Sequence, residues 1–336
     1  MILYNASLIN SPIDDPGVYL EFKHRRQAVL FDLGDLHALA PRKILKIEYI
    51  FVSHTHMDHF VGFDHLVRLC LGRNRRIAIF GPAGFIGNVE HRLQSYTWNL
   101  VNEYTNDFAL TVTEIDGNNR LQTAVFQCRT GFLREPQPGG NSFHGILMEN
   151  SQFYVKAACL DHKIPCLAFC FEEHERLNIK KNALQDMGLP TGPWLNDLKD
   201  YILRGSGDDE ACRVWWKAGD GRVVERFIPL GTLKERVVKM TSGHRIAYVT
   251  DVLYSAENIR KIVELVEGAE ILFIEGTFLQ EDHEKAARKY HLTAEQAGTI
   301  ARMAGVKRLV LFHMSPKYKG SEELLIREAM EAFTFH

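Results

Sequence analysis

The sequence lacks the features of a disulfide scaffold, an exported chain or a membrane protein. Its six cysteines are scattered over 336 residues without a C-x-x-C pair, and a chain of this length can bury a large core without disulfides. We expect reduced, buried thiols, with a soft-metal site at Cys166 and Cys170 as the alternative. No apolar run reaches the roughly 18 residues of a membrane helix, and the N-terminus resembles no signal peptide. These absences predict a cytoplasmic protein without membrane association.

Net charge is also nearly absent. The 40 Lys and Arg residues are balanced by 42 Asp and Glu residues, so the formal charge is −2. This excludes a protein whose whole surface attracts nucleic acid, because such binding needs a strong positive excess. One basic cluster remains, and it either faces an RNA backbone or is a solvated helix end and turn. Its members are Arg68, Arg73, Arg75 and Arg76.

The order of apolar segments favours an α/β fold. Short runs such as QAVLFDLG, YIFVSH and CLAFCF are rich in β-branched and aromatic residues and are bounded by turn formers, which is typical of buried strands. Later the strands RIAYVTD, ILFIEGTF and RLVLFH alternate with helical segments at about 256–266, within 282–304 and from about 322. This order predicts sheets covered by helices in an α/β sandwich.

Residues 171–240 interrupt that order. They contain the turn-rich polar segments MGLPTGP, RGSGDDEA and AGDGR, which predict an insertion outside the main core. The sequence therefore predicts one domain made from residues 1–170 and 241–336, with residues 171–240 as an inserted arm.

Metal-binding side chains are concentrated in one segment, HTHMDH, directly after the apolar run YIFVS. His54, His56, Asp58 and His59 lie within six residues. Imidazole nitrogens and carboxylate oxygens suit Zn²⁺, and the same donors accept Mn²⁺ or Fe²⁺. A loop that leaves a strand end can direct these side chains toward neighbouring metal positions. The segment therefore predicts a metal site.

HTHMDH resembles the H-x-H-x-D-H signature of the metallo-β-lactamase superfamily, which implies an αββα sandwich. It also implies that Asp32 supports the histidine loop from behind. A hydroxide that bridges two metals roughly 3.5–4 Å apart would favour phosphodiester hydrolysis. The resemblance implies two zinc sites, one made by His54, His56 and His162 and the other by Asp58, His59 and His313, with Asp251 shared between them.

The segment FIEGTFLQEDHEKAARKYHLTAEQAGTIARMAGVKRLVLFHMSPKY resembles the ribonuclease Z family of tRNA 3′-processing endonucleases. In that family a Glu in an H-E-A-T-F-like motif pairs with a later His, which implies catalytic roles for Glu275 and His291 beside Asp58. A charged His can assist the leaving 3′-oxygen. The resemblance implies a homodimer that removes the 3′ trailer of precursor tRNA by attack of a metal-bridging hydroxide.

The inserted arm resembles the exosite of ribonuclease Z. A rigid Pro/Gly turn can present backbone N–H groups to phosphates; the alternative is that GLPTGP is simply a helix stop and turn. The match rests on four residues: Gly188, Pro190, Gly192 and Pro193. Three features depart from the family: Ile274 stands where the motif has His, INSPIDDPG has no Pro-Ser-Arg-Asn-type element, and residues 171–212 contain nine acidic against five basic residues.

These departures keep two alternatives open. One is a hydrolase of the same fold that acts on a small phosphodiester such as a cyclic nucleotide. The other is a non-catalytic RNA-binding protein. Thioester or lactone hydrolysis is less favoured, because those reactions give no task to Glu275 and His291.

Overall fold

A computed structural model describes residues 4–23, 25–241 and 243–335. The chain forms two compact units, Met1–Glu172 with His244–His336 and Glu173–Gly243. In the described residues, no helix combines the length and apolar character needed to cross a membrane.

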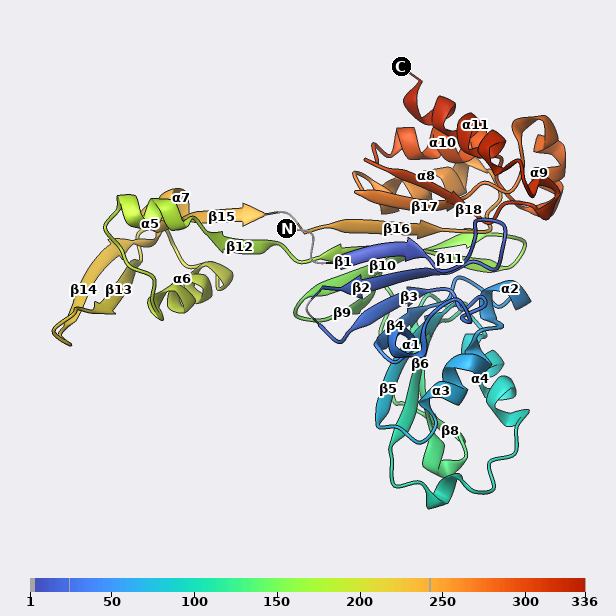
Figure 1. The fold of residues 1–336 in the computed structure, drawn as a ribbon, viewed down its shortest axis with the longest axis horizontal. Helices are drawn as coiled ribbons and strands as arrows, with labels where there is room; N and C mark the ends of the chain where they lie inside the picture. Colours follow the sequence, from blue (N-terminus) through green and yellow to red (C-terminus); the bar gives the residue numbers. More distant parts are fainter. Residues whose placement is uncertain (1–3, 24, 242, 336) are drawn as a thin grey trace. The chain divides into compact units, whose positions relative to one another are not determined.

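The first unit begins with an eight-stranded sheet in the order β1 to β8 (Figure 1). The strands β3 to β6 run parallel to one another, and the flanking strands pair antiparallel. The strands are β1 Tyr4–Leu8, β2 Val18–Phe22, β3 Ala28–Phe31, β4 Ile47–Phe51, β5 Arg75–Gly81, β6 Phe108–Ile115, β7 Leu121–Gln127 and β8 Arg134–Pro136. The associated helices are α1 Pro41–Ile44, α2 Met57–Phe60, α3 Phe63–Cys70 and α4 Phe85–Gln94, with 3-10 turns Val101–Glu103 and Cys128–Thr130.

A second sheet of six strands has the order β18-β17-β16-β11-β10-β9. Its parallel part, β16 to β18, is built from strand-helix-strand units, as the sequence predicts. The strands are β9 Ile146–Glu149, β10 Phe153–Asp161, β11 Pro165–Glu173, β16 Arg245–Val249, β17 Ile271–Glu275 and β18 Leu309–Phe312. The helices are α8 Ala256–Val266, α9 His283–Lys289, α10 Ala294–Met303 and α11 Glu322–Thr334, with 3-10 turns Gln280–Asp282 and Pro316–Tyr318.

Aromatic side chains fill the space between the two sheets. Phe31 of the first sheet stacks on Tyr248 of the second at 5.7 Å between ring centroids, and Phe169 lies 5.6 Å from Phe51. Separate apolar clusters lie between each sheet and its own helices. The layers are therefore helix, sheet, sheet, helix, and the predicted αββα sandwich is confirmed.

Local features of the chain explain why α9 ends and α10 begins where they do. Tyr290 ends α9 in the left-handed region with φ 60°, which a further helical residue cannot follow. Thr293 then begins α10 with a capping box, in which its side chain accepts from the Gln296 N–H and the Gln296 side chain accepts from the Thr293 N–H. These two features define the short segment that carries His291.

The second unit has its own small core. Its strands pair antiparallel, β12 with β15 and β13 with β14, around the fully buried side chains of Trp194, Leu198 and Val214. Its elements are β12 Arg176–Ile179, α5 Lys181–Asp186, α6 Trp194–Leu203, β13 Ala211–Lys217, β14 Val223–Pro229, α7 Leu230–Val237 and β15 Val238–Thr241. The second unit therefore forms regular helices and strands although its sequence is rich in turn formers.

Candidate metal centre

The histidine-rich loop follows directly from β4 and leads into α2. His56 precedes α2 with extended backbone angles, φ −62° and ψ 154°. This sharp change of direction separates His54 and His56, which lie before the helix, from Asp58 and His59 in its first turn. His54 and His59 are buried, whereas Asp58 is partly exposed.

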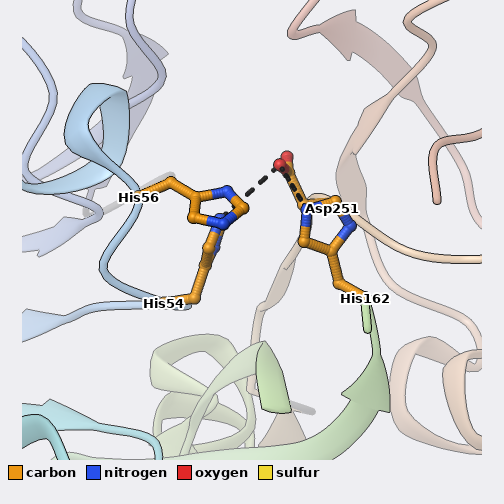
Figure 2. Close-up of side chains that lie close together, drawn as sticks. All are labelled: His54, His56, His162 and Asp251. Atoms are coloured by element: carbon orange, nitrogen blue, oxygen red, sulfur yellow. Dashed lines mark ion pairs between the residues drawn. The ribbon is translucent and has the colours of Figure 1, made fainter. Parts of the chain in front are cut away.

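A first ligand cluster consists of His54, His56, His162 and Asp251 (Figure 2). One ligand atom of each residue lies within 4.8 Å of the others. Asp251 Oδ2 lies 3.6 Å from His54 Nε2 and 3.4 Å from His162 Nε2. The four side chains thus surround one small volume.

A second cluster consists of Asp58, His59 and His313. Asp58 Oδ2 lies 3.2 Å from His313 Nε2 and 3.5 Å from His59 Nε2. The other oxygen of Asp251, Oδ1, lies 3.5 Å from His59 Nε2 and 3.3 Å from His313 Nδ1. Asp251 therefore faces the first cluster with one oxygen and the second cluster with the other.

Strained backbone at three strand ends brings these side chains together. Asp32, Asp251 and His313 have φ values of 58°, 35° and 55°, in the region that non-glycine residues rarely adopt. Each residue follows the end of a strand, β3, β16 or β18, by one or two positions. Such strain persists where surrounding contacts hold it, and it is common at functional sites.

Asp32 supports the centre from behind. Its buried carboxylate accepts hydrogen bonds from Ser53 N at 2.6 Å, Ser53 Oγ at 2.8 Å and Tyr248 Oη at 2.7 Å. His59 Nδ1 donates to the same carboxylate at 2.7 Å. Since Nδ1 is occupied, Nε2 of His59 is directed to the cluster.

His162 is oriented in the same way by a main-chain group. Its Nδ1 donates to the carbonyl of Tyr290 at 2.8 Å, which leaves Nε2 facing Asp251. A carbonyl acceptor requires the proton on Nδ1, so the ring presents a lone pair at Nε2.

The burial of unpaired nitrogens fits a bound cation. Nε2 of His54 and Nε2 of His59 are buried and have no hydrogen-bond partner among the described residues, which is costly unless another group satisfies them. Burial lowers the pKa of His54 to about 2, so that ring is a neutral donor. The residues therefore fit a divalent metal, for which neutral imidazole and carboxylate are suitable ligands.

The charged groups of the centre shift one another's pKa values. Burial raises the pKa of Asp251, but His313 and His59 outweigh it and hold that pKa well below its ordinary value. Burial lowers the pKa of His59, but Asp251 and Asp32 outweigh it and raise that pKa well above its ordinary value. His59 would have to lose this proton in order to hold a cation at Nε2, so metal binding there would be accompanied by proton release.

Glu275 and His291 form a second polar pair beside the clusters. Glu275 Oε2 accepts from His291 Nδ1 at 3.0 Å and from Thr277 Oγ1 at 2.6 Å, while Oε1 accepts from Val252 N at 2.7 Å. The His291 ring centroid lies 5.1 Å from that of His162. Burial lowers the pKa of His291, but Glu275 outweighs it and raises that pKa to about 9. A raised pKa favours the protonated ring, which can serve as an acid.

The predicted arm residues lie in the second unit. Gly188 has φ 63° just after α5, and the Pro190 carbonyl accepts from Trp194 Nε1 at 3.0 Å. A Cβ on Gly192 would lie 3.2 Å from the Trp194 ring, and Pro193 precedes α6. The segment therefore closes over Trp194.

The arginine cluster is mostly engaged by the protein itself. Arg73 and Arg75 donate to the main-chain carbonyls of Leu69 and Ile47 at 2.8 and 2.7 Å, and Arg76 pairs with Asp107 at 2.5 Å. These contacts favour a structural role. Cys166 and Cys170 are buried and belong to none of the ligand clusters in the described residues.

Sequence reasoning missed the groups that orient the ligands. Ser53 and Tyr248 hold Asp32, and Tyr290 holds His162. Tyr248 lies on the strand that leads to Asp251. Its neighbours form an ordinary apolar strand pattern, so the sequence does not indicate that its phenol makes a polar contact. Tyr290 acts through its carbonyl, for which a sequence carries no signal.

Comparison with known proteins identifies the class to which this fold and site belong. Residues 26–145 and 235–314 match the family described as the beta-lactamase superfamily domain, and the chain belongs to that family. Within it, the chain is 28% identical to the ribonuclease Z of Deinococcus radiodurans, over 98% of this chain and 96% of the relative. It is also 28% identical to the ribonuclease Z of Methanothermobacter thermautotrophicus, over 88% and 80%. The predicted resemblance to the superfamily and to ribonuclease Z is confirmed.

Solved structures agree on the fold. The short form of human tRNase Z matches with a TM-score of 0.51 at 19% identity, over 94% of this chain and 92% of that protein. The metallo-β-lactamase fold protein YhfI of Bacillus subtilis matches with a TM-score of 0.54 at 14% identity, over 98% and 92%.

Proposed function

We propose that this protein is a metal-dependent phosphodiesterase of the ribonuclease Z type, an endoribonuclease that removes the 3′ trailer of precursor tRNA. Relatives named ribonuclease Z align over nearly the whole chain. The single observation that carries the proposal is the Glu275–His291 pair beside the two ligand clusters. Such a pair supplies an acid for a leaving alkoxide.

Two metal ions, zinc or alternatively manganese or iron, belong to this proposal. When bound, they would supply charge stabilisation at the scissile phosphate and activation of water. Their ligands would be His54, His56 and His162 for one ion and Asp58, His59 and His313 for the other, with Asp251 between them.

Asp58 would orient the attacking water. Burial raises its pKa, but the hydrogen bond from His313 and the charge of His59 outweigh it and lower that pKa. The carboxylate is therefore ionised at neutral pH. It is also partly exposed, which leaves it accessible to a water on the substrate side.

His291 would protonate the leaving 3′-oxygen. Glu275 occupies Nδ1, so Nε2 carries the proton available to the substrate. Because the pKa of His291 is raised to about 9, the ring holds this proton at neutral pH. The products would be a tRNA that ends in a 3′-hydroxyl and a free trailer.

The hydrolase domain of residues 1–170 and 241–336 and the arm of residues 171–240 also belong to the proposal. Residues 171–212 are net acidic, but residues 213–241 contain seven Lys or Arg against three acidic residues. Phosphate binding by the arm would therefore come from β13, β14 and α7 more than from the Gly-Pro element. A homodimer in the cytoplasm is part of the same proposal.

Cleavage of a precursor tRNA by the metal-loaded enzyme tests the proposal. The wild-type protein should cut near the discriminator and leave a 3′-hydroxyl, and Asp58→Ala should not. Glu323→Gln, which removes an exposed charge on α11, is the matched control and should cut normally. No cleavage of precursor tRNA by a zinc-loaded wild-type protein would contradict the proposal.

A second candidate function is hydrolysis of a small phosphodiester. Asp14 and Asp15 line the cavity beside the centre, and their charge disfavours a polyanionic substrate. Hydrolysis of a cyclic nucleotide without cleavage of precursor tRNA would support this candidate. The non-catalytic RNA-binding alternative requires a protein that gains no activity on addition of Zn²⁺ or Mn²⁺.

A further inference from the structure

A cavity of about 300 Å³ adjoins the candidate metal centre. Asp58, His291 and His313, which belong to the centre, contribute to its lining. The remaining lining residues come from four segments of the first unit, residues 13–15, 277–278, 289 and 314–316.

Lys289 is the one Lys or Arg that lines this cavity in the described part of the chain. Its side chain is exposed, and no ion pair within residues 4–23, 25–241 and 243–335 involves it. Its ammonium group is therefore available to an anionic ligand, and it presents a compact charge on a flexible stem.

The backbone that carries Lys289 is fixed next to the metal ligands. Lys289 is the last residue of α9, and the carbonyl of the following residue, Tyr290, accepts from His162 Nδ1 at 2.8 Å. The next residue, His291, is held by Glu275 at 3.0 Å. The backbone next to Lys289 is therefore held both by His162 of the first ligand cluster and by the Glu275–His291 pair.

Carboxylates line another part of the same cavity. The loop that carries Asp14 and Asp15 is held by the Met314 N–H, which donates to the Pro12 carbonyl at 2.8 Å, and by the Asn10 amide, which donates to the Asp15 carbonyl at 2.9 Å. Carboxylates repel a phosphate but accept hydrogen bonds from N–H and O–H groups. A nucleotide in the cavity therefore has one favourable orientation, with its phosphate toward Lys289.

We propose that Lys289 is a positioning residue that binds the phosphate adjoining the scissile phosphate. The cavity then holds one flanking nucleotide, with its phosphate on Lys289 and its sugar or base donors facing Asp14 and Asp15. This inference rests on the proposed function, because it needs a polynucleotide substrate. It assigns to this chain a substrate contact that its histidine and aspartate motifs do not contain.

The first test compares Lys289→Ala with Arg288→Ala. Arg288 is also exposed and lies on the same helix, but it does not line the cavity. Loss of a charged hydrogen bond to phosphate should lower kcat/KM for precursor tRNA roughly tenfold to a hundredfold in Lys289→Ala. Arg288→Ala should change it by no more than about twofold. Both variants should keep their metal content and hydrolyse bis(p-nitrophenyl) phosphate, which has one phosphate, at the wild-type rate.

A second test identifies the phosphate. Precursor tRNA is synthesised with an uncharged methylphosphonate on one side or the other of the scissile bond. One of the two replacements should slow the wild-type enzyme, and the same replacement should add no further loss in Lys289→Ala. Additive losses at both positions, an equal loss in Arg288→Ala, or a matching loss on bis(p-nitrophenyl) phosphate would overturn the inference.

Failure of the proposed function is recognised separately. If the wild-type enzyme hydrolyses diesters but not precursor tRNA, the proposed function is wrong. The role of Lys289 is then tested on the p-nitrophenyl ester of thymidine 5′-phosphate, with and without a 3′-phosphate. A preference for the 3′-phosphorylated ester that disappears in Lys289→Ala supports the contact. No such preference contradicts it.

Discussion

The candidate metal centre and the second unit differ in the groups that they bury. At the centre, the buried carboxylate of Asp32 is held by three donors besides His59. In the second unit, the buried residues are apolar and surround Trp194, while the charged residues are mostly exposed. The comparison teaches that a chemical site needs a buried polar network, whereas a binding surface needs only a stable support and suitable surface charge.

Removal of the shared carboxylate should have the largest effect. Asp251→Ala leaves His54, His59, His162 and His313 without their common partner, so both clusters should lose metal. We expect phosphodiesterase activity to fall by more than about 10³-fold, because metal chemistry and transition-state stabilisation are lost together. Metal analysis of the purified variant checks the cause: a variant that keeps two metals while losing activity would contradict the shared role.

The acid group should matter less than the metal ligands. His291→Ala should lower kcat by roughly 10²- to 10⁴-fold, the usual contribution of general acid catalysis, while the metal content stays that of the wild type. Glu275→Gln should lower kcat by a smaller factor, because the His291 ring stays in place. Loss of metal from His291→Ala would instead assign His291 to the third ligand group, with Asp251 and His313.

Disruption of the second unit should separate binding from chemistry. Trp194→Ala removes a fully buried ring and its hydrogen bond to Pro190, and should destabilise this unit by about 3–5 kcal/mol. Precursor tRNA cleavage should fall sharply, whereas hydrolysis of bis(p-nitrophenyl) phosphate and metal content should not change. Hydrogen exchange of residues 173–243 measures the loss of structure; an equal loss of both activities would show that the two regions are not independent.

A buried network outside the centre should affect stability alone. Glu172 accepts from Tyr154 at 2.7 Å and pairs with Lys156 at 2.8 Å and Arg245 at 3.1 Å. Burial raises its pKa, but Lys156 and Tyr154 outweigh it and lower that pKa below its ordinary value of 4.5. The stabilisation is therefore present above pH 4.5 and is lost as the pH falls through the lowered pKa.

Glu172→Gln should destabilise the protein by roughly 1–3 kcal/mol at pH 7 without changing activity per bound metal. Urea unfolding at pH 7 and at acidic pH measures the effect, and the difference from the wild type should shrink in acid. A difference that is constant with pH would assign the effect to packing.

Much of the fold was predictable because hydrophobic periodicity is local. The segment after Ser255 is helical over the predicted range 256–266 because Ser255 caps it and its apolar residues recur at helical spacing. The regular structure of residues 173–241 was not predicted. Turn-forming sequences there, such as GLPTGP, cover a core that depends on contacts of Trp194 with residues distant in sequence.

The sequence by itself determined the family and the candidate metal-binding segment, because HTHMDH places its donors within six residues and needs no distant contact to be recognised. The tertiary structure alone decided which groups hold the candidate ligands from behind and which groups line the cavity beside them. Tyr248 reaches Asp32 from 216 positions away, and Lys289 shares a cavity with Asp15 from another part of the chain. The physical reason is that strained strand ends and buried hydrogen bonds bring such groups together only when both sheets have packed.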